Sequence, residues 1–214
     1  MPYTYLRSGI AALVCSYAAV TASAAPAPAA NDAAAGLLAT INSVTDLVIG
    51  QTPAAIDAKL PEIQKKMEES FATKVIVQRT FGRNWAKLTP AQQTEVIDLL
   101  GRLVIRAYAT QLSKGSRPVI AVTGSHDLGP DRREVTTTAT QDGKTVNIVY
   151  RLGQIDGGWK VYDVLAEGVS VVANYREQFD AHFQKKNAAD LIEMLKGKLA
   201  APETAAQPEP APKK

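Results

Sequence analysis

Residues 156 to 179, DGGWKVYDVLAEGVSVVANYREQF, contain the change from strand to helix on which the interpretation of the whole chain depends. The stretch begins with the turn residues Asp156-Gly157-Gly158, continues as an apolar strand and passes into a helical pattern with almost no break. It also contains carboxylates, a serine and aromatic residues. It could therefore form the floor of an active site, or the wall of a cavity that holds a ligand without changing it.

Three further strand patterns precede this stretch. Residues 117–129 (RPVIAVTGSHDLG) and 131–141 (DRREVTTTATQ) meet at Gly129-Pro130, and Asp142-Gly143 is a hairpin signal before residues 144–152 (KTVNIVYRL). Four strands joined by short turns predict an antiparallel meander.

Alternation along the third and fourth strands predicts which side chains share a face. On the third strand, one face is predicted to carry Val146, Ile148, Tyr150 and Leu152. On the fourth strand, Tyr162 and Val164 are predicted to share a face, with Trp159, Val161 and Leu165 on the other.

Helical patterns lie on both sides of these strands. The clearest covers residues 88–112, where Thr89 is the predicted N-cap, Pro90 takes the first helical position and Gln92 completes a capping box. Other helical patterns lie at residues 32–50, 53–70, 71–85, 169–183 and 187–199. Helices, then an antiparallel sheet, then helices indicate the α+β class.

The N-terminus has the pattern of a secretory signal peptide. Arg7 precedes an apolar run over residues 10–20, and Ala22 and Ala24 form an A-x-A site, so cleavage is expected after residue 24. Cys15, the single cysteine, lies in this run after the bulky Val14, which is unlike a lipoprotein signal. The mature protein is therefore expected to lack disulfides and thiol chemistry.

The rest of the chain divides by composition. Residues 25–31 are expected to be a flexible Ala/Pro linker, residues 32–199 a single domain, and residues 200–214 a disordered Ala/Pro-rich tail. The chain is 46% hydrophobic, which suits one soluble domain with a core. Its 24 Lys and Arg exceed its 21 Asp and Glu by 3, and loss of Arg7 reduces the excess to 2, too small to indicate nucleic-acid binding.

Residues that could carry catalysis are few. His126 and His182 are far from any metal-ligand spacing, and Ser170 lacks the second glycine of a nucleophile elbow and falls where a helix begins. Asp163 and Glu167 could be paired carboxylates in a pocket, but a lone hydrogen-bonded acid in an apolar strand is often architectural. We therefore predict no catalytic residue, no metal site and no cofactor.

A series of short motifs occurs in order between about residues 71 and 195. They are Phe81-Gly82-Arg83-x-Trp85, Thr89-Pro90-x-Gln92-Gln93, Arg106-x-Tyr108, Tyr150-Arg151-Leu152, Asp156 to Val164, Glu167-Gly168-Val169-Ser170 and Asn174-Tyr175-Arg176-x-x-Phe179. Together they resemble the MlaC family of periplasmic phospholipid-binding proteins, also called toluene-tolerance auxiliary proteins. The sequence departs from the family at Val96, where an aromatic residue is expected, and in the tail after Ala200.

The resemblance implies a non-enzymatic periplasmic shuttle that carries a phospholipid between an outer-membrane lipoprotein complex and an inner-membrane ABC lipid transporter. It implies a curved four-stranded antiparallel sheet packed by N- and C-terminal helices around an apolar cavity that holds the acyl chains. Some members of the family are associated with hopanoid transport, and the sequence does not separate the two cargoes.

On this interpretation the lipid-binding side chains are those expected on the inner face of the sheet and on the helices that cover it. They are Phe81, Trp85, Val104, Tyr108, Val122, Tyr150, Leu152, Tyr162, Val164, Val169 and Val172. Two other interpretations stay open: a cone-shaped α+β enzyme, which needs a carboxylate or histidine inside a pocket, and a structural envelope protein, which needs a solidly packed sheet.

Overall fold

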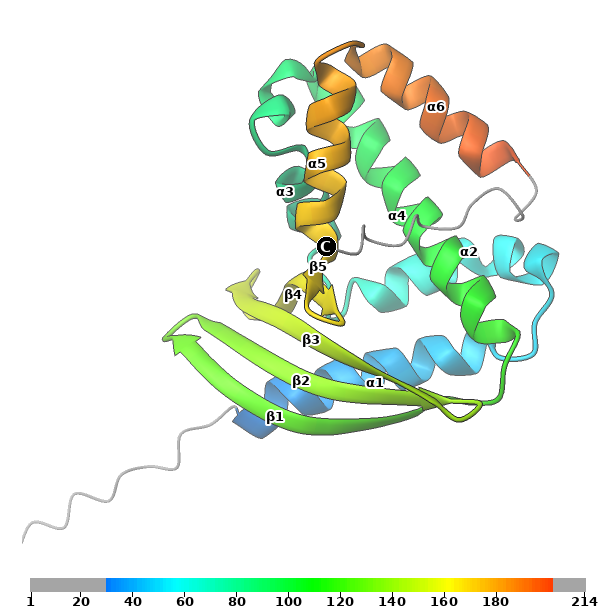
Figure 1. The fold of residues 1–214 in the computed structure, drawn as a ribbon, viewed down its shortest axis with the longest axis vertical. Coiled ribbons are helices and arrows are strands. Elements are labelled where there is room, and N and C mark those ends of the chain that lie inside the picture. The colour runs from blue at the N-terminus through cyan, green and yellow to red at the C-terminus, as the bar shows by residue number, and fades with distance from the viewer. Residues whose placement is uncertain (1–29, 202–214) are drawn as a thin grey trace, which may run out of the picture.

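The computed structural model describes residues 30–201, and the predicted signal peptide, most of the linker and most of the tail lie outside them. Four helices and a short 3-10 helix precede a five-stranded sheet, and two helices follow it (Figure 1). In chain order the elements are α1 (Ala30–Val48), α2 (Pro53–Met67), α3 (Thr73–Phe81), η1 (Gly82–Lys87), α4 (Pro90–Ser113), β1 (Val119–Gly129), β2 (Arg132–Gln141), β3 (Lys144–Ile155), β4 (Gly158–Ala166), β5 (Val169–Ser170), α5 (Val171–Phe183) and α6 (Ala188–Ala200). The α+β class is confirmed.

The start of α4 has the predicted capping box. The backbone N–H of Gln92 donates to the Thr89 hydroxyl (3.3 Å), and the backbone N–H of Thr89 donates to the Gln92 side chain (3.0 Å). These two bonds satisfy N–H groups that the first turn of a helix leaves free. Local sequence therefore fixes where this 24-residue helix begins.

The sheet is antiparallel throughout, in the order β1-β2-β3-β4-β5. The prediction of four strands was wrong, because Val169 and Ser170 form a fifth strand that pairs with Ala166 and Leu165 at the end of β4. Two residues are too few to show alternation, so the sequence shows only the helix that follows them.

A bulge in β4 changes which side chains share a face. Leu152 pairs with Val161 and Arg151 pairs with Asp163, so Tyr162 is an extra residue on β4. Val161 therefore shares the inner face with Val164, and Tyr162 does not. The predicted grouping of Tyr162 with Val164 was wrong, because strict alternation does not allow for an inserted residue.

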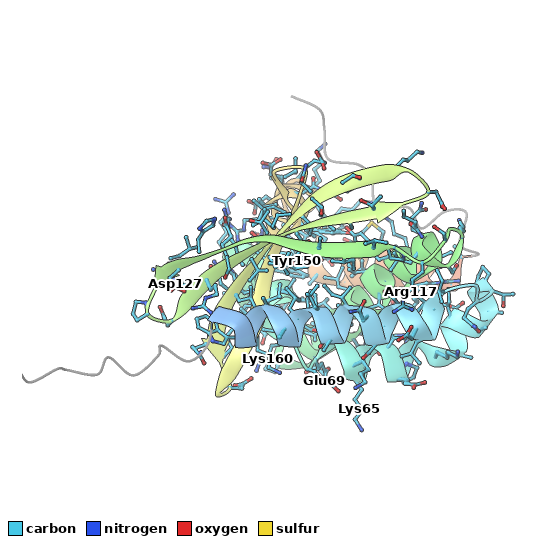
Figure 2. The ribbon with its side chains drawn as sticks, turned by 90° about the horizontal axis from the view of Figure 1, so that it is seen from below. Lys65, Glu69, Arg117, Asp127, Tyr150 and Lys160 are labelled. Carbon is cyan, nitrogen blue, oxygen red and sulfur yellow. The ribbon has the colours of Figure 1, made fainter. Side chains whose placement is uncertain are left out.

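Helix α1 lies along the inner face of the sheet (Figure 2). Its residues Ala33, Ala34 and Leu37 pack in one cluster with Val135, Tyr150, Leu152 and Val161 of the sheet. A second cluster joins α3, α4, α5 and α6 around the fully buried Phe81, and a third joins α1, α2 and α4. The space between sheet and helices is thus bounded by packed walls.

The link between α2 and α3 is tied to β4. The backbone N–H of Val161 donates to the carbonyl of Ser70 (2.7 Å), and the N–H of Ala72 donates to the carbonyl of Val161 (2.9 Å). Phe71 thereby forms a parallel bridge with Val161. This strap, residues 70–72, supplies hydrogen-bond partners to backbone groups in the part of β4 that β5 does not reach. It also fixes α3 against the sheet.

Candidate functional site

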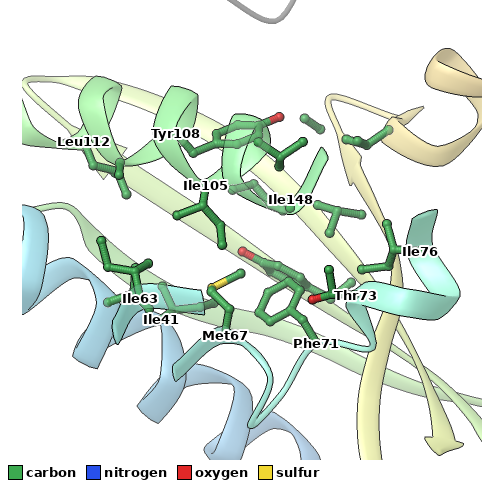
Figure 3. A pocket seen from close by; sticks show the side chains of 18 of the residues that line it. Ile41, Ile63, Met67, Phe71, Thr73, Ile76, Ile105, Tyr108, Leu112 and Ile148 are labelled. Atoms are coloured by element: carbon green, nitrogen blue, oxygen red, sulfur yellow. The ribbon is translucent and has the colours of Figure 1, made fainter. Parts of the chain in front are cut away.

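A cavity of about 330 Å³ lies between the inner face of the sheet and the helices that cover it (Figure 3). This volume is at the lower end of the range for small-molecule sites in proteins. The helices contribute Ile41, Val44, Thr45, Ile63, Met67, Thr73, Ile76, Val77, Thr80, Leu100, Gly101, Val104, Ile105, Tyr108, Ala109, Leu112, Val171, Val172 and Tyr175. The sheet and connecting segments contribute Phe71, Pro118, Ile120, Ala139, Ile148, Tyr150, Val164 and Ala166.

Every one of these lining residues is uncharged, and three of the six hydroxyls among them already have partners. The hydroxyl of Thr45 donates to the carbonyl of Ile41 (2.8 Å), and that of Thr80 donates to the carbonyl of Val77 (2.7 Å). Tyr150 is hydrogen-bonded to Thr137. The wall therefore offers apolar contact over most of its area and suits a hydrocarbon.

The cavity opens beside Tyr108, which at 47% is the one lining residue that is exposed. Val146 and Val169 are also exposed, and each pairs in the sheet with a lining residue, Ala139 and Ala166 respectively. Exposed apolar side chains therefore lie next to two lining residues of the sheet.

The three tyrosines of the wall are weak acids even for tyrosine. Burial raises the pKa of Tyr150 to about 12, and burial also raises the pKa of Tyr108 and of Tyr175. The nearby Tyr108 phenol adds to the rise at both Tyr150 and Tyr175. All three phenols are therefore neutral at pH 7, and the cavity remains uncharged.

The structure brings five of the eleven predicted lipid-binding residues together in the lining: Val104, Tyr108, Tyr150, Val164 and Val172. The other six lie elsewhere. Phe81 and Trp85 belong to the cluster between the helices, and Leu152 belongs to the core under α1. Tyr162 stacks on the Arg79 guanidinium at 4.6 Å from the ring centroid, and Val122 and Val169 are exposed.

Sequence reasoning missed the contribution of the first three helices, including Ile41, Ile63, Met67 and Ile76. Their helical spacing shows that they face inward. Spacing cannot show whether such a face meets other side chains or a hollow.

Asp163 and Ser170 form a helix cap outside the cavity. The Asp163 carboxylate accepts from the backbone N–H groups of Val164 (2.9 Å) and Val172 (3.3 Å) and from the Ser170 hydroxyl (2.8 Å). That hydroxyl accepts in turn from the backbone N–H of Ala173 (3.0 Å). Both side chains hold the start of α5 in place, which is the architectural role weighed for Asp163 above.

The histidines lie apart from the cavity as well. The ring of His182 contacts the carbonyl of Asn187 at 3.0 Å and packs on Phe183, and His126 is exposed on β1. Within residues 30–201, His, Asp and Glu side chains form no group that could hold a metal ion. In the same range, no helix combines the length and the apolar character needed to cross a membrane.

The sequence profile of the MlaC protein family matches residues 40–197 of this chain. The chain is also similar in structure to a phospholipid-binding protein from Ralstonia solanacearum, solved in complex with a phospholipid, with a TM-score of 0.69 and 25% sequence identity. That similarity covers 78% of this chain and 96% of the other. A comparison with curated proteins found no match. Because the family profile spans most of the chain, from α1 to α6, the protein belongs to the MlaC family.

Proposed function

We propose that this protein is a periplasmic lipid carrier without enzymatic activity. It binds the acyl chains of a phospholipid in the cavity and moves the lipid between an outer-membrane lipoprotein complex and an inner-membrane ABC lipid transporter. The observation that carries the proposal is the uncharged cavity enclosed by the sheet and five helices. Family membership and the signal-like N-terminus support the periplasmic location.

The energetics of hydrocarbon in water explain why a carrier needs such a cavity. Each methylene removed from water contributes about 0.8 kcal/mol, so an acyl chain of about sixteen carbons costs on the order of 12 kcal/mol to leave exposed. Transfer between membranes is slow unless a protein covers the chains. An apolar wall that lacks charged side chains lowers this cost without holding the lipid by specific ion pairs.

The structural neighbour supports the same cargo. The Ralstonia protein was solved with a phospholipid, and the similarity extends over nearly all of that chain. An enzyme of the cone-shaped α+β type would instead place an acid or a histidine in its pocket, and the described lining contains neither. A solidly packed structural protein would not leave a cavity of this size.

Mass spectrometry of an organic extract from the purified protein tests the proposal. We expect phospholipid to co-purify, and we expect delipidated protein to take up labelled phospholipid from vesicles. A protein that is purified without lipid and also fails to take it up would rule out the carrier function. Exchange with membranes that contain the transporter complex would then test the shuttling step separately.

A further inference from the structure

Two phenol hydroxyls of the cavity wall, those of Tyr108 and Tyr175, make no hydrogen bond to any residue between 30 and 201. The hydroxyls of Thr45, Thr80 and Tyr150 all have partners. Thr73 is the third hydroxyl without one, and it comes from a different part of the wall, beside Phe71 (Figure 3). The otherwise apolar wall thus presents three hydroxyl groups that have no hydrogen-bond partner among residues 30–201.

Tyr108 and Tyr175 line the same cavity from two different helices. Tyr108 lies on α4 and is the exposed lining residue, and Tyr175 lies on α5 one turn after Val171, which also lines the cavity. The ring of Tyr175 is held against Phe179, with 5.9 Å between centroids.

Free donors at this place have an energetic consequence for the ligand. In the empty protein, water in the cavity can bond both hydroxyls. A ligand that fills the cavity with hydrocarbon removes this water, and each donor then costs free energy unless the ligand supplies an acceptor. In a diacyl lipid the ester carbonyls lie between the apolar chains and the polar headgroup, at the depth where a cavity opening meets solvent.

We propose that the hydroxyls of Tyr108 and Tyr175 donate hydrogen bonds to the ester carbonyl oxygens of the bound lipid. They thereby select ester-linked glycerolipids over lipids with the same chains but no carbonyl group. This inference rests on the proposed carrier function and adds to it the residues that determine specificity. It also favours a glycerolipid over a hopanoid, whose hydrocarbon rings offer no acceptor at this position.

The test is a competition between two lipids of equal chain length. Delipidated full-length protein is incubated with vesicles that contain equal amounts of a diester phosphatidylglycerol and its diether analogue, and the bound ratio is measured by mass spectrometry. We expect the wild-type protein to prefer the diester by about fivefold for each hydroxyl, the ratio that corresponds to one net hydrogen bond of ~1 kcal/mol. Tyr108→Phe with Tyr175→Phe should bring the ratio close to one.

Phenylalanine keeps the ring and removes only the hydroxyl, so these variants should fold, and Tyr108→Phe alone is the safer change because Tyr108 is half exposed. Thr73→Val is the matched control, since it removes the third free hydroxyl and should leave the preference intact. Equal uptake of both lipids by the wild-type protein, or a preference that survives both Tyr→Phe changes or is lost in Thr73→Val, would overturn the inference and leave the carrier function standing. Uptake of neither lipid would overturn both.

Discussion

Val164 is the wall residue at which filling the cavity can be separated from damaging the fold. It lies opposite Tyr150 in the β3–β4 pair, and both side chains line the cavity. We expect Val164→Trp to expel lipid, because the indole occupies space that the acyl chains need. The loss of stability should be below the ~1–3 kcal/mol typical of overpacking a solid core. Lipid retention and thermal unfolding are to be measured on the same preparation.

Val149→Trp is the matched control for this change. Val149 precedes Tyr150 on β3 and pairs with Leu165, so alternation turns it away from the cavity. The control should retain lipid. A Val164→Trp protein that melts much earlier and still holds lipid would show that Val164 belongs to an ordinary core.

The phenol of Tyr150 makes stability depend on alkaline pH. Burial raises its pKa from 10.0 to about 12. Below pH 10 the phenol is protonated in both the folded and unfolded states. Between pH 10 and 12 the unfolded state loses this proton first, so the free energy of unfolding falls as pH rises, by roughly 2–3 kcal/mol. Tyr150→Phe should remove this part of the decline.

Urea unfolding of both proteins between about pH 9 and pH 12 measures the effect. The difference in unfolding free energy between wild type and variant should be constant below pH 10 and should shift in favour of the variant above it. Parallel curves over the whole range would mean that Tyr150 is not buried as described.

Prediction of individual wall residues from sequence succeeded where a regular pattern continued and failed where it was interrupted. Alternation placed Tyr150 and Val164 in the wall, although the strict alternation assumed for the fourth strand was wrong. The bulge at Tyr162 moves Val161 to the inner face, and an inserted residue has no signature in apolar spacing. Ile63 and Met67 were missed because an inward-facing helical residue looks the same in sequence whether it meets a neighbour or a hollow.

At the scale of elements, the junction of β4, β5 and α5 depends on one buried acid. Asp163 accepts from two backbone N–H groups and from the Ser170 hydroxyl. We expect Asp163→Asn to lower the free energy of unfolding by about 1–2 kcal/mol, because an amide has one acceptor oxygen where the carboxylate has two. Lipid binding should be unchanged, since Asp163 lies outside the cavity lining.

Glu167→Gln is a control in the same junction. Its carboxylate accepts from the backbone N–H of Asn147 (2.6 Å), but the side chain is exposed, so the change should cost little. Loss of lipid binding in Asp163→Asn at unchanged stability would indicate that the carboxylate acts on the ligand and would contradict its structural role.

Elements with their own local signals were predicted well. The capping box at Thr89 marks the start of α4, and Asp142-Gly143 marks the β2–β3 turn, where both residues have positive φ. The two-residue β5 and the strap at Phe71 were not predicted. Both form because N–H and C=O groups of β4 need hydrogen-bond partners, and that need arises only once the chain has folded.

At the scale of the whole molecule, Arg106 joins three helices. It is buried on α4, its Nη1 donates to the carbonyl of Leu199 at the end of α6 (2.7 Å), and its Nε lies 2.9 Å from a carboxylate oxygen of Asp57 on α2. Arg106→Met keeps the apolar stem and removes the charge. We expect a loss of about 2–3 kcal/mol in the free energy of unfolding, below the full cost of breaking a buried pair because Asp57 is partly exposed.

Arg102→Met on the same helix is the comparison. Arg102 pairs with Asp98 at 3.5 Å, and both side chains are well exposed, so its loss should cost less than about 0.5 kcal/mol. Denaturant unfolding of the two variants measures the difference. Similar losses would mean that Arg106 does not hold α2 and α6 to α4.

The overall order of helices, meander and helices could be predicted because each element has its own periodicity. The position of the cavity could not, because it depends on how far α1, α2 and α4 stand from the sheet. Those distances depend on contacts such as the bridge of Phe71 with Val161, which joins residues 90 positions apart in the chain.

The two register shifts in β1, after Val122 and after Asp127, affect how copies of the protein meet. β1 is the outermost strand of the sheet, and an 11-residue strand with a regular free edge is a template on which a strand of another molecule can add. Each bulge breaks the even spacing of N–H and C=O groups that such addition needs and increases the local twist. The irregular edge thus works against intermolecular aggregation and favours separate molecules, as the proposed carrier function requires.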